Sequence, residues 1–323
     1  MIRKLVKVFV ILGCIIVVSV CCVYMYNTQF IERMDQAETA SSHTKFIDIE
    51  GETLAYSEID NQAPTTVVFV GGLSAWNGTW ERVVEELNSK QKHFNYIALD
   101  LPPFGFSTPD QSKGYFRDVQ AQRIEAFVKA KKIEHVILVG HSYGAGPVTE
   151  YVMKNQTNVQ KLILIDAVLN IDETKIINTH SPAQLGFLRN LLIGTLIHNN
   201  SFALSRLKSF VFVTDHIDQE LLAIYTEYFK TEGVTERLSY WFGDYMNDPL
   251  TYTSNASENY KNLAIPVRLI WGDKDTLTPL SGTAILLAMV PDIQLYTLEN
   301  VGHIPMIEDY ALFDNALFLA LEK

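Results

Sequence analysis

Short apolar runs alternate with amphipathic stretches over most of the chain. Apolar residues at helical spacing fill 115–131 and 145–154, between runs that are mostly apolar throughout. Such runs are typical of parallel strands buried on both faces, with helices forming the crossovers. The pattern predicts an α/β fold with a mostly parallel central sheet, helices on both faces and an opening hairpin at 46–59. The other predicted strands are 67–70, a strand ending at Leu99, 135–139, 161–165, 267–271 and 293–298.

The alternation of strands and helices stops between Ile165 and Val267. This connection is too long for a simple crossover. Within it, 183–197 and 219–228 carry apolar residues at helical spacing. We therefore expect a helical cap over 170–262, inserted into a core made of 45–169 and 263–323. Ordinary packing helices without a gating role are the alternative.

The N-terminus carries Arg3, Lys4 and Lys7, followed by an uncharged run of 19 residues, Val8–Tyr26. A helix of that length crosses a bilayer, so 1–26 is expected to be a transmembrane anchor and 27–44 a short polar stalk. The positive charge ahead of the run predicts a single-pass protein with a cytoplasmic N-terminus and an extracytoplasmic main domain. A cleaved secretory signal is the alternative, although the run is longer than a signal core and no small-x-small cleavage pattern ends it.

The charge and the cysteines exclude several classes of function. The formal net charge of −11 repels polyanions, so nucleic acid is not an expected partner. The three cysteines, Cys14, Cys21 and Cys22, lie inside the apolar run, which leaves the rest of the chain without a disulfide or a cysteine nucleophile. No zinc or EF-hand spacing is present, so no metal is implied.

The residues Gly140-His141-Ser142-Tyr143-Gly144 follow the strand-like run 135–139 and precede a predicted helix. A strand that enters a helix through so sharp a turn holds the central residue in a strained conformation with its side chain exposed. The glycines on either side avoid Cβ collisions. Ser142 is therefore a candidate nucleophile, and His141 beside it is interpreted as a packing residue.

From about Phe46 to its C-terminus the chain resembles the α/β-hydrolase family, because further segments match the family's motifs in order. Gly71 stands where many members carry histidine, and Pro103 replaces a more usual glycine. The matching segments are Val67–Leu73 for the strand and oxyanion loop, Asp100–Ser107 for the loop after the next strand, Trp271–Pro279 for the acid loop and Gly302–Pro305 for the histidine loop.

A serine nucleophile needs a base to take its proton, and the base needs an acid to orient it. His303 follows the run 293–298 in a glycine-bearing loop and is the expected base. The resemblance favours Asp275 as the acid, with Asp273 as a turn residue or helix cap. Asp166 ends another strand, after which some members place their acid, and is the alternative.

The resemblance implies that the backbone N–H groups of Leu73 and Tyr143 form an oxyanion hole. It also implies a serine hydrolase that cleaves a carboxylic ester or related acyl compound through Ser142, Asp275 and His303, with a small-molecule acyl substrate and no cofactor. Peptidase, C–C bond hydrolase and haloperoxidase-like activities on the same fold are alternatives, as is a non-catalytic ligand-binding receptor. Protein partners do not follow from the sequence.

Overall fold

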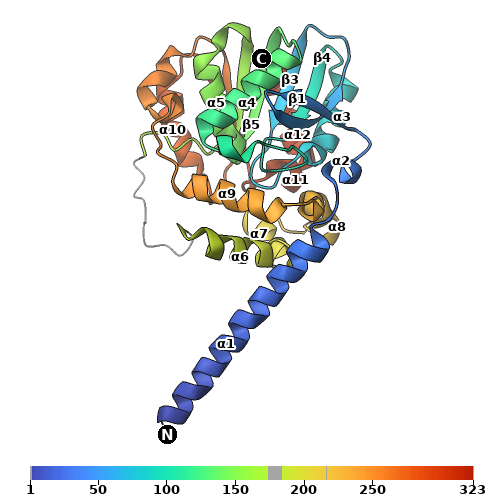
Figure 1. The fold of residues 1–323 in the computed structure, drawn as a ribbon. Helices are drawn as coiled ribbons and strands as arrows, with labels where there is room; N and C mark the ends of the chain where they lie inside the picture. The colour runs from blue at the N-terminus through green and yellow to red at the C-terminus, as the bar shows by residue number, and fades with distance from the viewer. Residues whose placement is uncertain (1, 174–183, 216, 323) are drawn as a thin grey trace.

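The computed structural model describes residues 2–173, 184–215 and 217–322. An eight-stranded sheet lies at its centre (Figure 1), and its strand order is β1-β2-β4-β3-β5-β6-β7-β8. β1 pairs antiparallel with β2, β2 pairs antiparallel with β4, and the remaining neighbours are parallel. The predicted hairpin and mostly parallel sheet are confirmed. The strands are β1 Thr44–Ile49, β2 Glu52–Ile59, β3 Thr65–Val70, β4 Phe94–Leu99, β5 His135–His141, β6 Val159–Ile165, β7 Val267–Gly272 and β8 Ile293–Leu298.

Helices cover both faces of the sheet and enclose two hydrophobic cores. Alternate residues of β3 point to opposite faces, so Val68 and Val70 belong to the core with α4, α5 and α10. Val67 and Phe69 belong to the core with α3 and α12. Burial on both faces explains why most residues of β3 are apolar. The helices are α3 Glu81–Lys90, α4 Arg117–Ala130, α5 Ala145–Lys154, α10 Thr283–Met289, α11 Pro305–Glu308 and α12 Tyr310–Glu322.

The described part of the connection between β6 and β7 is helical, and we call residues 184–262 the helical insertion. Side-chain caps begin two of its helices: Asn199 accepts a hydrogen bond from the N–H of Phe202, and Asp218 accepts from those of Glu220 and Leu221. The insertion lies along one side of the sheet (Figure 1). The predicted helices at 183–197 and 219–228 are present, although residue 183 is outside the described residues. The helices are α6 Gly186–Leu196, α7 Asn200–Ser209, α8 Gln219–Thr226 and α9 Val234–Met246, followed by short 3₁₀ turns up to Asn262.

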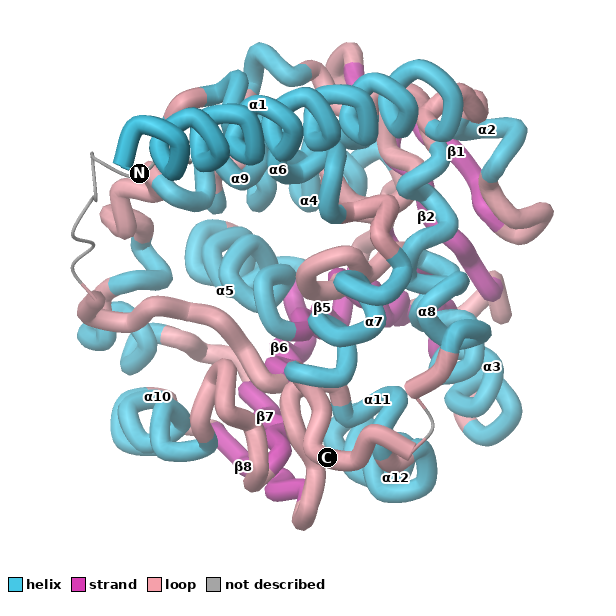
Figure 2. Tube along the Cα trace, turned by 90° about the horizontal axis from the view of Figure 1, so that it is seen from below, coloured by secondary structure: helices cyan, strands magenta, loops and turns pink. Residues whose placement is uncertain are grey.

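A long N-terminal helix, α1 (Ile2–Tyr26), projects from the side of the molecule that the insertion forms (Figure 1). Among the described residues it gives the one segment long and apolar enough to cross a membrane, a property that membrane anchors and signal sequences share. Seen from below, α1 passes across α6 and α9 (Figure 2).

The segment expected to be a polar stalk makes specific contacts in the structure. Asn27 and Glu32 are buried against the helical insertion. The side-chain amide of Asn27 donates to the carbonyl of Gly194 at 2.7 Å, and the carboxylate of Glu32 accepts from the hydroxyl of Thr235 on α9. The short helix α2 (Gln36–Thr39) follows and leads into β1. Polar composition predicted a solvated segment, whereas these polar groups find partners on the helical insertion.

Candidate active site

Ser142 lies in the turn between β5 and α5. Its φ is +50°, in the left-handed region, where a residue other than glycine costs on the order of 1–3 kcal/mol. The carbonyl of Ser142 accepts a hydrogen bond from the N–H of Val168 at 3.0 Å, which ties the turn to the segment after β6. The strained turn predicted from the sequence is thus present, and surrounding contacts stabilise it.

The glycines around Ser142 are required by close approach of neighbouring atoms. A Cβ at Gly140 would lie 2.5 Å from the side chain of Val148, and one at Gly144 would collide with the carbonyl of Gly71. A Cβ at Gly72 would lie 2.7 Å from Cβ of Ser142. The loop 71–73 therefore passes directly beside the serine, and no larger residue fits at these positions.

The structure brings Ser142, His303 and Asp275 into one hydrogen-bonded chain. Nε2 of His303 lies 2.8 Å from Oγ of Ser142, and its Nδ1 lies 2.7 Å from Oδ2 of Asp275. A carboxylate only accepts, so Nδ1 carries the proton and Nε2 is free to accept the serine proton. The three side chains are buried and come from the ends of β5, β7 and β8.

Asp275 is held by donors on both of its oxygens. Its Oδ1 accepts from the N–H groups of Leu277 at 2.7 Å and Thr278 at 2.9 Å, and Oδ2 accepts from the Thr278 hydroxyl as well as from His303. Burial alone would raise the pKa of Asp275, but the hydrogen bonds and charge of His303 and the bonds from Thr278 outweigh it and lower that pKa below its ordinary value. The carboxylate is therefore ionised at neutral pH.

The two other acidic candidates make different contacts. Asp166 is fully buried, and its Oδ1 accepts from the N–H of Gly272 at 2.9 Å. Burial, and secondarily the charge of the neighbouring Asp275, raise the pKa of Asp166 well above its ordinary value, so ionisation of this carboxyl is disfavoured. Asp273 accepts from the N–H of Asn300 at 2.6 Å and pairs with Lys274, which is the turn role predicted for it.

The two predicted oxyanion residues flank Ser142. Tyr143 follows it in the 3₁₀ turn Ser142–Gly144 that leads into α5, where a helix N-terminus favours an anion. Leu73 follows Gly72 and is half exposed at the wall of a cavity. The assignment of their backbone N–H groups to an oxyanion hole stays a prediction.

Two side chains that sequence reasoning did not assign to the site support the His303 loop. His141 donates from Nε2 to the carbonyl of His303 at 2.9 Å. Glu308 is buried and accepts from the N–H groups of Gly302 at 2.9 Å and Phe212 at 2.7 Å, which joins the loop to the helical insertion. The sequence offered only one indication of each role: His141 is next to Ser142, and Glu308 follows His303 by five residues.

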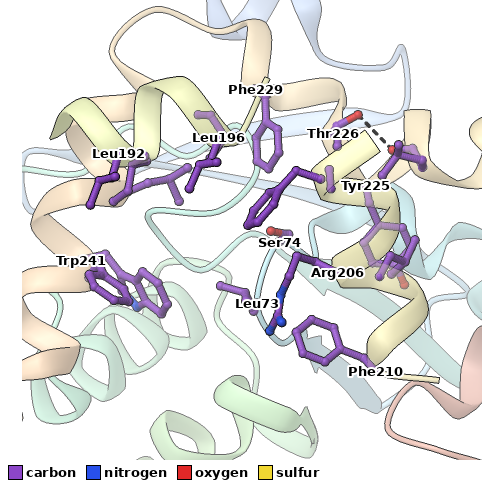
Figure 3. A pocket seen from close by; sticks show the side chains of 18 of the residues that line it. Leu73, Ser74, Leu192, Leu196, Arg206, Phe210, Tyr225, Thr226, Phe229 and Trp241 are labelled. Atoms are coloured by element: carbon purple, nitrogen blue, oxygen red, sulfur yellow. Dashed lines mark hydrogen bonds between the residues drawn. The ribbon is translucent and has the colours of Figure 1, made fainter. Parts of the chain in front are cut away.

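A cavity of about 530 Å³ lies between the helical insertion and the loop that carries Leu73 and Ser74 (Figure 3). Leu73 and Ser74 lie between Trp241 on one side and Arg206 and Phe210 on the other. Ile304, the residue after His303, also lines it. The remaining lining is largely apolar: Leu192, Ile193, Leu196, Ile197, Phe202, Ala203, Leu207, Leu222, Tyr225, Phe229, Leu238 and Phe242, with Arg189 and Thr226.

Among residues 2–173, 184–215 and 217–322, no group of three or more His, Cys, Asp or Glu side chains is arranged to hold a metal ion. The acidic residues near Ser142 are instead engaged by His303, Thr278 and backbone N–H groups.

Comparisons with known proteins point to one family. A family model described as alpha/beta hydrolase fold matches residues 65–310. Lipase 3 of Moraxella sp. (strain TA144) is 24% identical over 285 residues, covering 83% of this chain and 82% of that protein. A 2-hydroxymuconate semialdehyde hydrolase of Pseudomonas sp. (strain CF600) is 25% identical over 75% of this chain and 80% of its own. The structure of an esterase from Exiguobacterium antarcticum superposes with a TM-score of 0.67 at 18% identity, over 86% of this chain and 98% of that one.

Proposed function

The chain belongs to the α/β-hydrolase fold family and is a hydrolase, and from that premise we propose that it is a serine hydrolase of carboxylic esters or related acyl compounds. The observation that carries the proposal is the continuous hydrogen-bonded chain from Ser142 through His303 to Asp275, with distances of 2.8 and 2.7 Å. A buried imidazole in this tautomer beside a strained serine has the arrangement needed for nucleophilic catalysis.

In the acylation step, Oγ of Ser142 forms a bond to the substrate carbonyl carbon while Nε2 of His303 takes the hydroxyl proton. The oxygen of the tetrahedral intermediate carries the negative charge, which the N–H groups of Leu73 and Tyr143 stabilise. The bond to the alcohol oxygen then breaks, and the alcohol leaves with the proton from His303. Asp275 stabilises the imidazolium throughout and remains an ionised carboxylate.

In deacylation, water takes the place of the departed alcohol. His303 accepts a proton from the water while the water oxygen forms a bond to the acyl carbon. His303 then donates a proton to Oγ of Ser142 when the acyl–serine bond breaks. The products are a carboxylic acid and the regenerated serine. Every proton in this cycle moves through Nε2 of His303, so both steps depend on the same geometry.

The lining of the cavity supports a substrate with an apolar acyl or alcohol group. Apart from Ser74, Thr226 and two arginines, the side chains that line it are apolar or aromatic. An apolar cavity of this size binds a hydrocarbon portion by removing it from water, while a few polar groups orient the reacting end. The helical insertion supplies most of this lining, and we propose that residues 170–262 act as the cap over a core of 45–169 and 263–323.

We also propose that residues 1–26 are an uncleaved anchor rather than a removed signal, with the N-terminus cytoplasmic and the hydrolase domain extracytoplasmic. The close approach of Tyr24 on α1 to Gly194 on α6 supports retention, because the end of α1 itself packs against the helical insertion. The basic residues before the apolar run support the orientation.

A C–C bond hydrolase is the second candidate, because the similarity to the Pseudomonas semialdehyde hydrolase covers three quarters of the chain. Ester and C–C hydrolysis share a serine site, so substrate profiling separates them. If this second function holds, a substrate that is cleaved at a carbon–carbon bond, such as a keto acid with two conjugated double bonds, should be turned over faster than any p-nitrophenyl ester.

The proposed function is tested with a fluorophosphonate probe and p-nitrophenyl esters of graded chain length. We expect labelling of the full chain, loss of labelling in Ser142→Ala, and faster hydrolysis of medium-chain than of acetyl esters. A folded full chain that is not labelled and hydrolyses no ester would contradict the proposal and favour a ligand-binding receptor.

A further inference from the structure

The end of the long N-terminal helix is fastened to the helical insertion. The side chain of Asn27 donates to the carbonyl of Gly194 on α6, and Glu32 accepts from the hydroxyl of Thr235 on α9 at 2.5 Å. Nε2 of His198, just after α6, lies 3.0 Å from the Glu32 carboxylate. Glu32 is thus bound between two parts of the insertion. Where α1 enters a bilayer, the helical insertion is therefore the part of the domain held nearest to it (Figures 1 and 2).

The α6–α7 face of the insertion has a composition unlike the rest of the protein. Residues 184–214 contain Arg189, Arg206 and Lys208 and no aspartate or glutamate, in a chain of net charge −11. Apolar side chains are exposed on the same segment: Leu185, Phe187 at 72%, Leu192, Phe202 and Phe212. Exposed apolar side chains interspersed with basic ones are typical of surfaces that lie in the interface of an anionic bilayer.

The cavity reaches the same face. Leu192 and Phe202 are exposed and also line the cavity, and Arg206 lines it with its side chain between Leu73 and Phe210 (Figure 3). An acyl chain that left a bilayer at this face would pass from lipid to apolar side chains over a short path. It would therefore avoid the cost of crossing water.

We propose that the α6–α7 face lies on the surface of the bilayer that holds α1, and that the substrates are ester lipids taken from this bilayer into the cavity. The inference rests on the proposed function and adds the substrate class and the route. The occupant of the face is a phospholipid bilayer containing anionic lipids, because α1 directs the face toward it and the basic residues complement its charge. The acyl chain occupies the apolar cavity with its ester carbonyl at Ser142.

A direct test of contact uses Phe187→Trp in the full chain, reconstituted into vesicles of phosphatidylcholine and phosphatidylglycerol with brominated acyl chains. Phe187 does not line the cavity, and the four native tryptophans, Trp76, Trp80, Trp241 and Trp271, are buried. Leu287→Trp, on α10 away from α1, is the matched control at a half-exposed position. We expect bromine quenching of the added fluorescence for Phe187→Trp and little for Leu287→Trp, each after subtraction of the unmodified chain.

A second test compares two substrates in the same vesicles: a water-soluble short-chain p-nitrophenyl ester and a fluorogenic phospholipid ester within the bilayer. For Phe187→Glu we expect the ratio of the lipid rate to the soluble rate to fall about tenfold, since a large apolar group is replaced by a charge of the sign that anionic lipids repel. Leu287→Glu should keep the ratio of the unmodified chain.

The outcomes separate the two proposals. Hydrolysis of neither substrate by the unmodified chain would overturn the proposed function. Two outcomes would overturn the bilayer contact alone, provided that the unmodified chain hydrolyses the soluble ester. One is a ratio of lipid rate to soluble rate that does not change in Phe187→Glu. The other is equal bromine quenching of the tryptophans at positions 187 and 287. Absence of quenching at Phe187 together with cross-linking between copies of the chain through this position would assign the face to a protein interface instead, and would likewise overturn it.

Discussion

At the scale of single residues, the site separates two acids that look alike in the sequence. Asp166 and Asp275 both end strands of the parallel sheet, but only Asp275 lies within hydrogen-bond distance of His303. Asp166 is fully buried, and burial raises its pKa well above the ordinary value. The two carboxyls are therefore expected to differ in what they do for catalysis.

Asp275→Asn should lower kcat for a soluble ester by about 10⁴-fold, because an amide no longer selects the imidazole tautomer or stabilises its cation. Asp166→Asn preserves an acceptor for the N–H of Gly272, and Asp166 is outside the hydrogen-bonded chain of Ser142, so kcat should change by no more than a few-fold. Steady-state kinetics of both variants check the assignment. A large loss in Asp166→Asn with a nearly neutral Asp275→Asn would show that the acid is misassigned.

His141 makes a prediction about the pH dependence of stability. Burial, and secondarily the charge of His303, lower the pKa of His141 to about 3, so the folded protein keeps it neutral while the unfolded chain titrates near 6.5. As pH falls from about 6.5 toward 3, the unfolded state binds a proton that the native state does not, and stability is lost by up to about 1.4 kcal/mol per pH unit.

The buried carboxyl groups Asp100 and Asp166 act in the opposite direction, because their raised pKa values make the native state the one that binds protons. The contribution of His141 is isolated by comparison with His141→Gln, which retains a side-chain N–H donor. Between pH 6 and pH 4 the melting temperature of the variant should fall less than that of the unmodified chain. Parallel curves would show that His141 does not resist protonation.

At the scale of elements, close packing joins α1 to α6. A Cβ at Gly194 would lie 2.8 Å from the ring of Tyr24 and 3.0 Å from the side chain of Thr235, whereas a Cβ at Gly186, at the start of the same helix, meets nothing closer than 3.8 Å. The glycine at 194 is thus explained by the approach of α1, and that at 186 is not.

Two matched glycine-to-alanine variants on α6 test this contact. Gly194→Ala should lower the stability of the full chain by about 1–3 kcal/mol, since α1 or α9 must shift, and should expose residues 27–44 to protease. Gly186→Ala should be neutral or slightly stabilising because alanine favours the helix. Thermal unfolding in detergent and limited proteolysis supply the measurements. Equal behaviour of the two variants would mean that α1 does not pack on α6.

At the scale of the whole molecule, the proposed anchor divides the protein between two environments. We expect the full chain expressed in cells to remain in the membrane fraction after alkaline carbonate washing, with residues 1–26 present in the mature protein by mass spectrometry. The length and apolar character of α1 hold the chain in the membrane only if the segment is not cleaved, and the mass spectrum tests that. A soluble mature chain that begins after Tyr26 would identify the segment as a cleaved signal.

Much of the architecture was predictable because local patterns and the fold agree. The apolar runs that predicted β3, β5, β6 and β7 are largely buried strands, since burial on both faces favours apolar residues. β8 is also a strand, although it lies at the edge of the sheet and most of its residues are only partly buried. The glycine-flanked serine turn was predictable for a similar reason, because its neighbours in the fold leave no room for a Cβ at Gly140 or Gly144. The apolar runs and the spacing of the glycines can be recognised from neighbouring residues in the sequence, without information on distant contacts.

By itself, the sequence determined the α/β class, the helical nature of the connection between β6 and β7, the apolar N-terminal helix and the serine turn, because each depends on residues that are neighbours along the chain. The tertiary structure decided which acid lies beside His303, the support that His141 gives to its loop, the hydrogen bond that Glu308 accepts from the N–H of Phe212, and the burial of Glu32 against the helical insertion. These features join residues far apart along the chain, and a hydrogen bond between such residues exists only once the sheet has brought their loops to the same edge.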